Sequence, residues 1–150
     1  MPVAGAAHPA GPWAVPVPLD AHLVLRTHGA VSRTVRRFAA TVLEAWQHAD
    51  LIDDTEVIVS ELVGNVLRHT DSSHLAVSLR VQPEGTARGT LLGSVADCSP
   101  KLPGMRTADE GEEDGRGLSI VDRLAKEWGA RGTGCGKEVW FRLAAGPVMT

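Results

Sequence analysis

Three polar side chains recur along one face of a predicted helix. Glu61, Asn65 and Arg68 are spaced i, i+4 and i+7, so a carboxylate, a carboxamide and a guanidinium align when residues 53–70 form a helix of about 3.6 residues per turn. The opposite side of this segment carries a narrow apolar stripe, made of Val59, Leu62, Val63 and Val66. The pattern predicts a helix with one face in the core and one face suited to polar chemistry. A face that is simply solvated is the alternative.

Two further polar features follow in the second half of the chain. Asp97 ends a predicted strand and shares the parity of Leu91 and Val95, so its carboxylate should start on the inner side of a sheet; a turn-forming aspartate is the alternative. Gly115-Arg116-Gly117 is predicted to open a helix, where glycines let an anion approach free backbone N–H groups. A structural turn would explain the same glycines.

The elements that must position these groups follow from hydrophobic periodicity. We expect an edge strand at 22–26, helices at 31–46 and 53–70, strands at 75–81 and 90–96, a helix from 115 to Trp128 that ends at Gly129, and a strand at 138–143. Asp53 or Asp54 is expected to cap the second helix. The aperiodic segment 98–114 exceeds the usual length of a connector, so we expect a lid, a binding loop or disorder there.

These elements predict an α+β fold, a two-layer sandwich with helices on one face of a mostly antiparallel sheet. Residues 1–18 hold several prolines and no charged side chain, and are expected to form a mobile tail before a single domain at 19–150. Arg33, Arg36 and Arg37 lie on the outer face of the first predicted helix, where they could dock an acidic partner; a solvated face is the alternative.

Composition excludes several broad classes of protein. The net charge is −3 and the basic residues are scattered, which disfavours direct nucleic-acid or membrane-surface binding. No apolar run is long enough to span a membrane and no charged leader is evident, so a cytoplasmic protein is expected. Cys98 and Cys135 lie far apart in the sequence and are expected to be free thiols. The histidines show no metal-ligand spacing, and we predict no dedicated protein metal site.

Taken together, four segments resemble an ordered set of motifs in one known superfamily. They are Ser60-Glu61-Leu62-Val63-Gly64-Asn65 with His69, then Asp97, then Gly115-Arg116-Gly117-Leu118-Ser119-Ile120-Val121, and finally Gly136-Lys137-Glu138-Val139-Trp140-Phe141. They resemble the N, G1 and G2 boxes of the GHKL ATPase/kinase superfamily, with its Bergerat-type ATP-binding fold. The resemblance covers about residues 20–145 and is most specific for the anti-sigma factor serine/threonine kinases of bacteria.

The resemblance implies a role for each matching residue. The asparagine matching Asn65 binds the Mg²⁺ that bridges the triphosphate of ATP, and the glutamate matching Glu61 is the catalytic base or orients the attacking hydroxyl. The aspartate matching Asp97 accepts a hydrogen bond from the adenine amino group. The segment matching Gly115, Arg116, Gly117 and Leu118 contacts the bound nucleotide, with glycine N–H groups at the phosphates.

The resemblance also implies partners: an anti-anti-sigma antagonist of the STAS type as substrate, a sigma factor, and a second copy of the chain in a homodimer. Two departures from the family pattern are Cys98-Ser99-Pro100 after the aspartate, and Glu138 where a threonine associated with adenine often stands. Both departures favour a second hypothesis, in which the chain is a switch that holds a partner, with or without nucleotide, and transfers nothing. A third is an unrelated α+β domain in which the motifs coincide by chance.

Overall fold

A computed structural model describes residues 19–69, 72–84, 87–98 and 111–146. The elements are β1 (Leu19–Arg26), α1 (Val31–Ala45), a short 3₁₀ turn η2 (Ala49–Leu51), α2 (Ile52–His69), β2 (His74–Glu84), β3 (Ala87–Asp97), α3 (Gly111–Leu124), β4 (Glu127–Gly132) and β5 (Lys137–Ala144). The five strands form one sheet in the order β1-β2-β3-β5-β4. Every pair of neighbouring strands is antiparallel.

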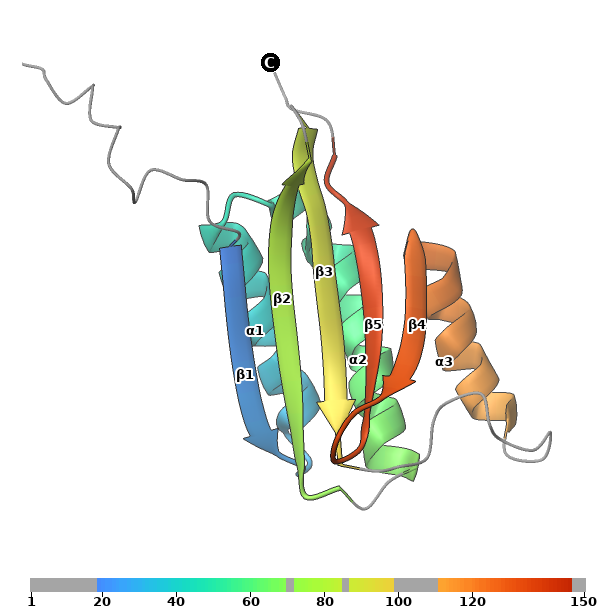
Figure 1. The fold of residues 1–150 in the computed structure, drawn as a ribbon. Coiled ribbons are helices and arrows are strands. Elements are labelled where there is room, and N and C mark those ends of the chain that lie inside the picture. The colour runs from blue at the N-terminus through green and yellow to red at the C-terminus, as the bar shows by residue number, and fades with distance from the viewer. Residues whose placement is uncertain (1–18, 70–71, 85–86, 99–110, 147–150) are drawn as a thin grey trace, which may run out of the picture.

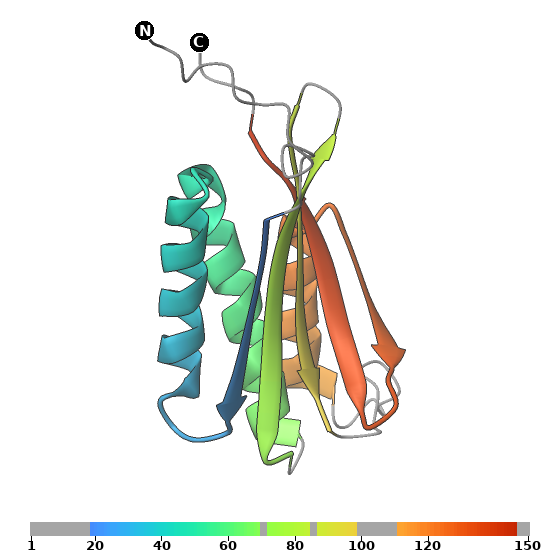
Figure 2. The same ribbon diagram turned by 60° about the vertical axis from the view of Figure 1, so that its left-hand side comes forward.

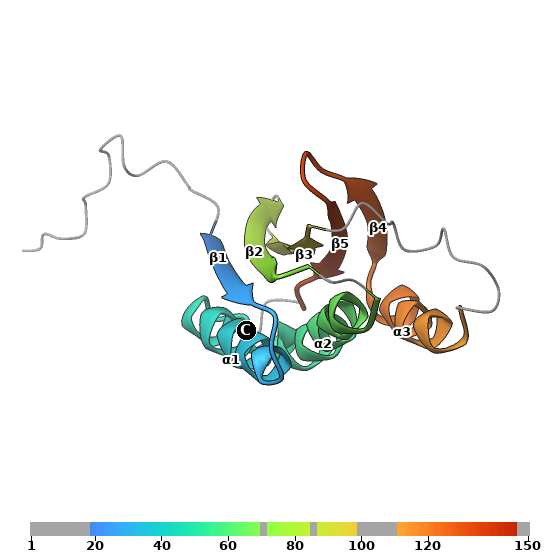
Figure 3. The ribbon, with the colours of Figure 1, turned by 90° about the horizontal axis from the view of Figure 1, so that it is seen from below.

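The molecule has two layers, as the sequence predicts. The three helices lie side by side on one face of the twisted sheet (Figure 3), and α2 occupies the middle of the helical layer, packed against both α1 and α3. The view in Figure 2 separates this helical layer from the strands. None of the helices in the described part of the chain is long and apolar enough to cross a membrane.

The core lies between the layers and follows the periodicities of the sequence. On α1, Val31, Val35, Ala39 and Leu43 are fully buried at intervals of four. The predicted apolar stripe of α2 is confirmed, because Val59, Leu62, Val63 and Val66 are all buried. Alternate residues of the strands complete the core, including Leu75, Val77, Leu79, Leu91, Val95, Val139 and Phe141.

Two expected boundaries are wrong. Asp53 and Asp54 do not cap α2, because η2 precedes the helix and places both carboxylates in its first turn. There they still complement the positive end of the helix dipole. Trp128 and Gly129 belong to β4 and not to the preceding helix, which ends at Leu124; Trp128 pairs with Phe141 across β4 and β5. A tryptophan four residues after Leu124 satisfies helical spacing, but aromatic residues also favour strands. Pairing with β5 makes this segment a strand.

The start of α3 also differs from the prediction. The helix begins at Gly111, so Gly115, Arg116 and Gly117 lie in its second turn and do not open it. Acidic residue types such as Glu112 and Glu113 are favoured in the first turn of a helix, which accounts for the earlier start. Of the predicted loop at 98–114, residues 99–110 lie outside the described residues, as does the predicted tail at 1–18.

Candidate functional site

Four elements bring chemistry-bearing segments to one end of the molecule. The C-terminal ends of α2 and β3 and the N-terminal ends of α3 and β5 all lie at the lower end in Figure 1. Antiparallel pairing of β3 with β5 causes part of this arrangement, because it puts Asp97 opposite Lys137. This end of the interlayer space is therefore the candidate site.

The polar face of α2 borders this space. Asn65 is buried: only 9% of it is exposed, and Val63 and Val66 beside it on α2 are buried too. Its Oδ1 accepts a hydrogen bond from Nη2 of Arg68 at 3.0 Å. The Arg68 guanidinium lies back over Gly64, where a Cβ would come within 2.9 Å of Nη1. The i+3 spacing and the glycine together let Arg68 orient the carboxamide.

Glu61 lies one turn before Asn65 and is half-buried. Its carboxylate makes no ion pair or side-chain hydrogen bond with any residue that the structure describes. A carboxylate that is partly withdrawn from water and not committed to a cation can accept a proton from a substrate hydroxyl. The geometry of α2 thus keeps the three predicted groups on one side, with Asn65 held and Glu61 available.

Asp97 lies on the inner face of the sheet, as its parity predicts, and it forms a buried ion pair that the sequence analysis did not anticipate. Nζ of Lys137 is 2.7 Å from Oδ2 of Asp97, and the two side chains are 5% and 1% exposed. Lys137 is thus a site residue that was missed. The alternation Lys137, Val139, Phe141 would have placed it on the inner face, because those positions share one side of a strand.

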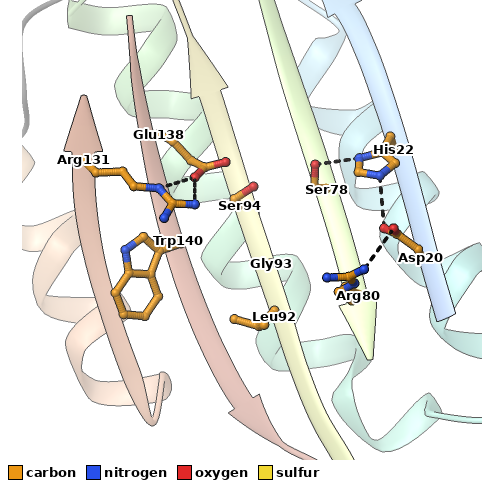
Figure 4. Close-up of a pocket in the computed structure, with 10 residues that line it drawn as sticks. All are labelled: Asp20, His22, Ser78, Arg80, Leu92, Gly93, Ser94, Arg131, Glu138 and Trp140. Atoms are coloured by element: carbon orange, nitrogen blue, oxygen red, sulfur yellow. Dashed lines mark hydrogen bonds and ion pairs between the residues drawn. The ribbon is translucent and has the colours of Figure 1, made fainter. Parts of the chain in front are cut away.

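The same alternation corrects the expected place of Glu138. Its side chain lies on the outer face of the sheet, where one carboxylate oxygen accepts hydrogen bonds from Arg131 at 2.8 and 2.6 Å. Figure 4 shows this pair at one side of a shallow hollow of about 350 Å³, with His22, Ser78, Asp20 and Arg80 at the other side. Glu138 therefore does not enter the candidate site, whereas its neighbour Lys137 does.

The remaining predicted residues are only partly placed. Leu118 is half-buried on α3. Gly115, Arg116 and Gly117 lie within α3, and the N–H groups of residues inside a helix are committed to carbonyls one turn earlier. The structure therefore places the start of α3 at the same end of the molecule as the other candidate residues but does not present these N–H groups to a ligand.

The basic face of α1 is smaller than expected. Arg36 is half-buried and donates hydrogen bonds to Ser32 at 3.1 Å and to Ser60 of α2 at 3.3 Å. Arg33 and Arg37 are exposed. Arg36 therefore fastens α1 to α2, and two arginines remain on the solvent side.

The comparisons with known proteins agree with this arrangement. Residues 27–143 match the histidine kinase-like ATPase domain family. A crystal structure of the RsbU and RsbW domains of Rv1364c from Mycobacterium tuberculosis is similar to the chain, with a TM-score of 0.59 and 18% sequence identity over 87% of this chain and 34% of that one. At this identity the similarity concerns the fold, and the chain spans about a third of that protein. A search of curated sequences finds no match.

The family match covers more than half of the chain, includes α2, β3, α3 and β5, and confirms the superfamily that the four sequence motifs resemble. The chain belongs to the histidine kinase-like ATPase domain family.

Proposed function

We propose that this chain is an ATP- and Mg²⁺-dependent serine/threonine protein kinase that phosphorylates an anti-anti-sigma antagonist of the STAS type. When unphosphorylated antagonist is scarce, it holds a sigma factor instead. Membership of the histidine kinase-like ATPase family supports the nucleotide, and the resemblance to an RsbW domain supports this class of partner.

One observation carries the catalytic part of the proposal. Glu61 lies one turn before the buried Asn65 on the same face of α2, and it is not paired with a cation among the described residues. A protein that only bound nucleotide would need a group such as Asn65 for the metal but no uncommitted carboxylate beside it. Glu61 is therefore assigned as the base that receives the proton of the attacking serine or threonine hydroxyl.

The residues present fit ATP with Mg²⁺. Oxygen atoms are the preferred ligands of Mg²⁺, and Oδ1 of Asn65 is a buried amide oxygen with a second lone pair beyond the one facing Arg68. A carboxylate offers about four acceptor positions, so Asp97 can bind Lys137 and still receive an amino group of a base. Bound ATP would supply the phosphoryl group, and Mg²⁺ would offset its negative charge.

Gly115, Arg116, Gly117 and Leu118 are proposed to border the nucleotide. For the glycine N–H groups to meet phosphate, the helix would have to begin at the glycines and not at Gly111 as it does here. Withdrawal of the first turn of α3 is therefore part of the proposal. It would expose unpaired N–H groups at the positive end of the helix dipole.

The proposal is tested by phosphate transfer to a candidate antagonist, together with nucleotide binding by calorimetry. We expect Glu61→Gln to lower the transfer rate by about 10²- to 10⁴-fold with nearly unchanged nucleotide affinity, because the base acts on the hydroxyl and not on the nucleotide. Asn65→Ala should abolish Mg²⁺-dependent binding. Glu56→Gln, which removes the same charge from another face of α2, is the matched control and should retain native transfer.

A second candidate function is a switch that binds a partner and transfers nothing. It is favoured by the internal bonds of the site, since Arg68 engages Asn65 and Lys137 engages Asp97. The same experiment separates the two: phosphoserine or phosphothreonine on the antagonist excludes the switch. Equal transfer by native protein and Glu61→Gln would overturn the catalytic assignment.

A further inference from the structure

The two cysteines of the chain are neighbours in space although they are 37 positions apart in sequence. The sulfur of Cys98 lies 3.8 Å from the sulfur of Cys135, and both residues are free and exposed. The expectation of free thiols is thus confirmed, but the thiols are not isolated. Because the sequence holds only two cysteines, any disulfide within the chain must join this pair.

The sheet fixes this proximity. Cys98 directly follows Asp97 at the end of β3, and Cys135 lies two positions before Lys137, the first residue of β5. Asp97 and Lys137 are direct partners in the ladder. At Gly136 a Cβ would overlap the backbone of Asp97 and Cys98, so the glycine allows the two chain segments to approach closely.

Local hydrogen bonds hold each cysteine in place. The N–H of Cys98 donates to Oγ of Ser72 at 3.0 Å. The turn before β5 is closed by the N–H of Thr133 to the carbonyl of Gly136 at 2.8 Å, and by the N–H of Gly136 to Oγ1 of Thr133 at 3.0 Å. Both sulfurs therefore sit on constrained backbone.

An apolar hollow gives reagents access to the pair. Its volume is about 170 Å³, and it opens between the ends of β1, β2 and β3, with Val24, Ala76 and Ala96 beside the two cysteines. A small, uncharged oxidant fits such a space better than an anion does. Hydroperoxides belong to this class.

We propose that Cys98 and Cys135 form a reversible disulfide when a hydroperoxide oxidises the protein, and that this bond weakens nucleotide binding by locking Asp97 onto Lys137. The distance between the sulfurs must fall from 3.8 Å to about 2.05 Å, which a rotation of the two exposed side chains can supply. The second part of the proposal rests on the function proposed above.

The reaction balances with one peroxide per pair. With hydrogen peroxide, one thiol loses its proton and its sulfur attacks a peroxide oxygen; the O–O bond breaks, and the departing hydroxide takes up a proton to become water. The second thiol then loses its proton and attacks the sulfenic sulfur; the S–O bond breaks, and the departing hydroxide takes up a proton and leaves as a second water. The two thiols lose two electrons, and the peroxide gains them.

The contact between the sulfurs couples the two thiols. A hydrogen bond between them, with the charge of Cys135, raises the pKa of Cys98. Because the sulfurs are only 3.8 Å apart, the second thiol is already in place to resolve a sulfenic acid formed on the first.

The disulfide would affect the candidate site through the end of β3 and the start of β5, where Asp97 and Lys137 lie. For Asp97 to stay bonded to Lys137 and also present its remaining acceptor positions to a base, the carboxylate must be able to reorient, which requires some freedom between the ends of β3 and β5. A covalent link one residue beyond Asp97 removes that freedom. It also closes a loop that contains α3 and β4.

The experiment treats the full-length protein with hydrogen peroxide and compares it with the dithiothreitol-reduced protein. Intact mass should show loss of two hydrogens without added oxygen, and the melting temperature should rise by about 10 °C, because the bond constrains the unfolded chain. Amide hydrogen exchange should slow at the ends of β3 and β5. Nucleotide affinity should fall at least about fivefold and recover on reduction.

Cys98→Ser and Cys135→Ser are matched controls, since each leaves one thiol and neither residue belongs to the binding machinery. Neither variant should show the rise in melting temperature or the loss of affinity. Disulfide-linked dimers, sulfinic acid as the main product, or unchanged affinity in the disulfide form would overturn the proposal. If the reduced protein binds no nucleotide while the disulfide forms and slows exchange, the proposed function fails and the thiol pair stands as a redox site.

Discussion

At the scale of single residues, the ion pair between Asp97 and Lys137 is the most demanding feature of the site. Both charged groups are almost completely withdrawn from water. Desolvation of two ions costs several kcal/mol each, so such a pair is weak evidence for stability, whereas loss of one partner leaves the other buried charge without its counter-ion. The pair therefore keeps two charged groups buried at the candidate site, where substitution of either residue should be costly.

Substitution of Lys137 tests this reasoning. Lys137→Met keeps much of the side-chain volume and removes the cation, so we expect a loss of about 3 to 5 kcal/mol in the free energy of unfolding. Asp97→Asn combined with Lys137→Met removes both charges and should recover most of that loss. Urea unfolding of the two single variants, the double variant and the native protein gives the coupling directly. Additive effects would show that the pair is not an energetic unit.

Prediction of single residues from the sequence succeeded where the hydrophobic pattern allowed only one orientation of the helix or strand. The stripe of α2 fixed which side Glu61 and Asn65 occupy, and the parity of β3 placed Asp97 inward. The partners of these residues were not predicted, although signals existed: Arg68 is i+3 from Asn65, and Lys137 shares parity with Val139. Hydrogen-bond choice among several neighbours depends on rotamers and backbone register, which spacing alone does not give.

At the scale of elements, the centre of the sheet depends on a glycine that leaves room for an aromatic ring on the neighbouring strand. Gly93 on β3 is paired with Phe141 on β5, and a Cβ at Gly93 would overlap the ring of Phe141. Among the residues that the structure describes, Phe141 is the largest fully buried side chain. The glycine thus makes room for the aromatic ring between sheet and helices.

Gly93→Ala should therefore destabilise the fold. We expect a loss of about 1 to 3 kcal/mol in the free energy of unfolding, the usual cost of overpacking a rigid core. Gly134→Ala is the control, because a Cβ there meets nothing within 4 Å, and it should be close to neutral. Urea denaturation compares the two. Equal stabilities would mean that Phe141 can move aside without cost.

Element type was more predictable than element boundaries. The three helices and the four strands expected at 22–26, 75–81, 90–96 and 138–143 occur in the predicted order, because long periodic segments such as α1 and α2 allow one interpretation, whereas β4 begins where a helix was expected to end. The errors lie where local signals compete. Gly115 and Gly117 suggested a helix start, yet the acidic turn before them is helical, and Trp128 fitted both helical spacing and a strand that pairs with β5.

At the scale of the whole molecule, one polar cluster joins segments far apart in the chain. Arg88, near the start of β3, contacts Oδ1 of Asp50 at 2.9 Å and also donates to the carbonyl of Gln47. The N–H of Gly146, beyond β5, donates to Oδ2 of Asp50 at 2.8 Å. The cluster fastens the turn between α1 and α2 to the sheet, at the end of the fold away from the candidate site. It is therefore a place where stability can be altered without direct contact with that site.

His48 makes this cluster sensitive to pH. Its ring is buried, and Nδ1 faces Nη2 of Arg88 at 3.4 Å. Burial, followed by the charge of Arg88, lowers the pKa of His48, although the charge of Asp50 acts in the opposite direction. The pKa of Asp50 is also lowered: burial alone would raise it, but hydrogen bonds from Gly146 and Arg88 outweigh that effect.

The lowered pKa of His48 predicts a loss of stability as the pH falls below the ordinary histidine value of 6.5. Below the ordinary value of 6.5 the unfolded chain takes up a proton that the folded protein refuses, so the free energy of unfolding falls as pH falls, until the lower pKa of the folded state is reached. The slope for one such group can approach about 1.4 kcal/mol per pH unit. Asp50 acts in a separate window, because its stabilising contribution is present above its ordinary value of 3.8 and is lost only at more acidic pH. His48→Asn keeps an acceptor for Arg88 but does not titrate, so it should flatten the pH dependence of stability measured by urea unfolding at each pH. If His48→Asn retained the native slope, the pH sensitivity would have to originate elsewhere in the fold, and the cluster would be a purely structural clamp.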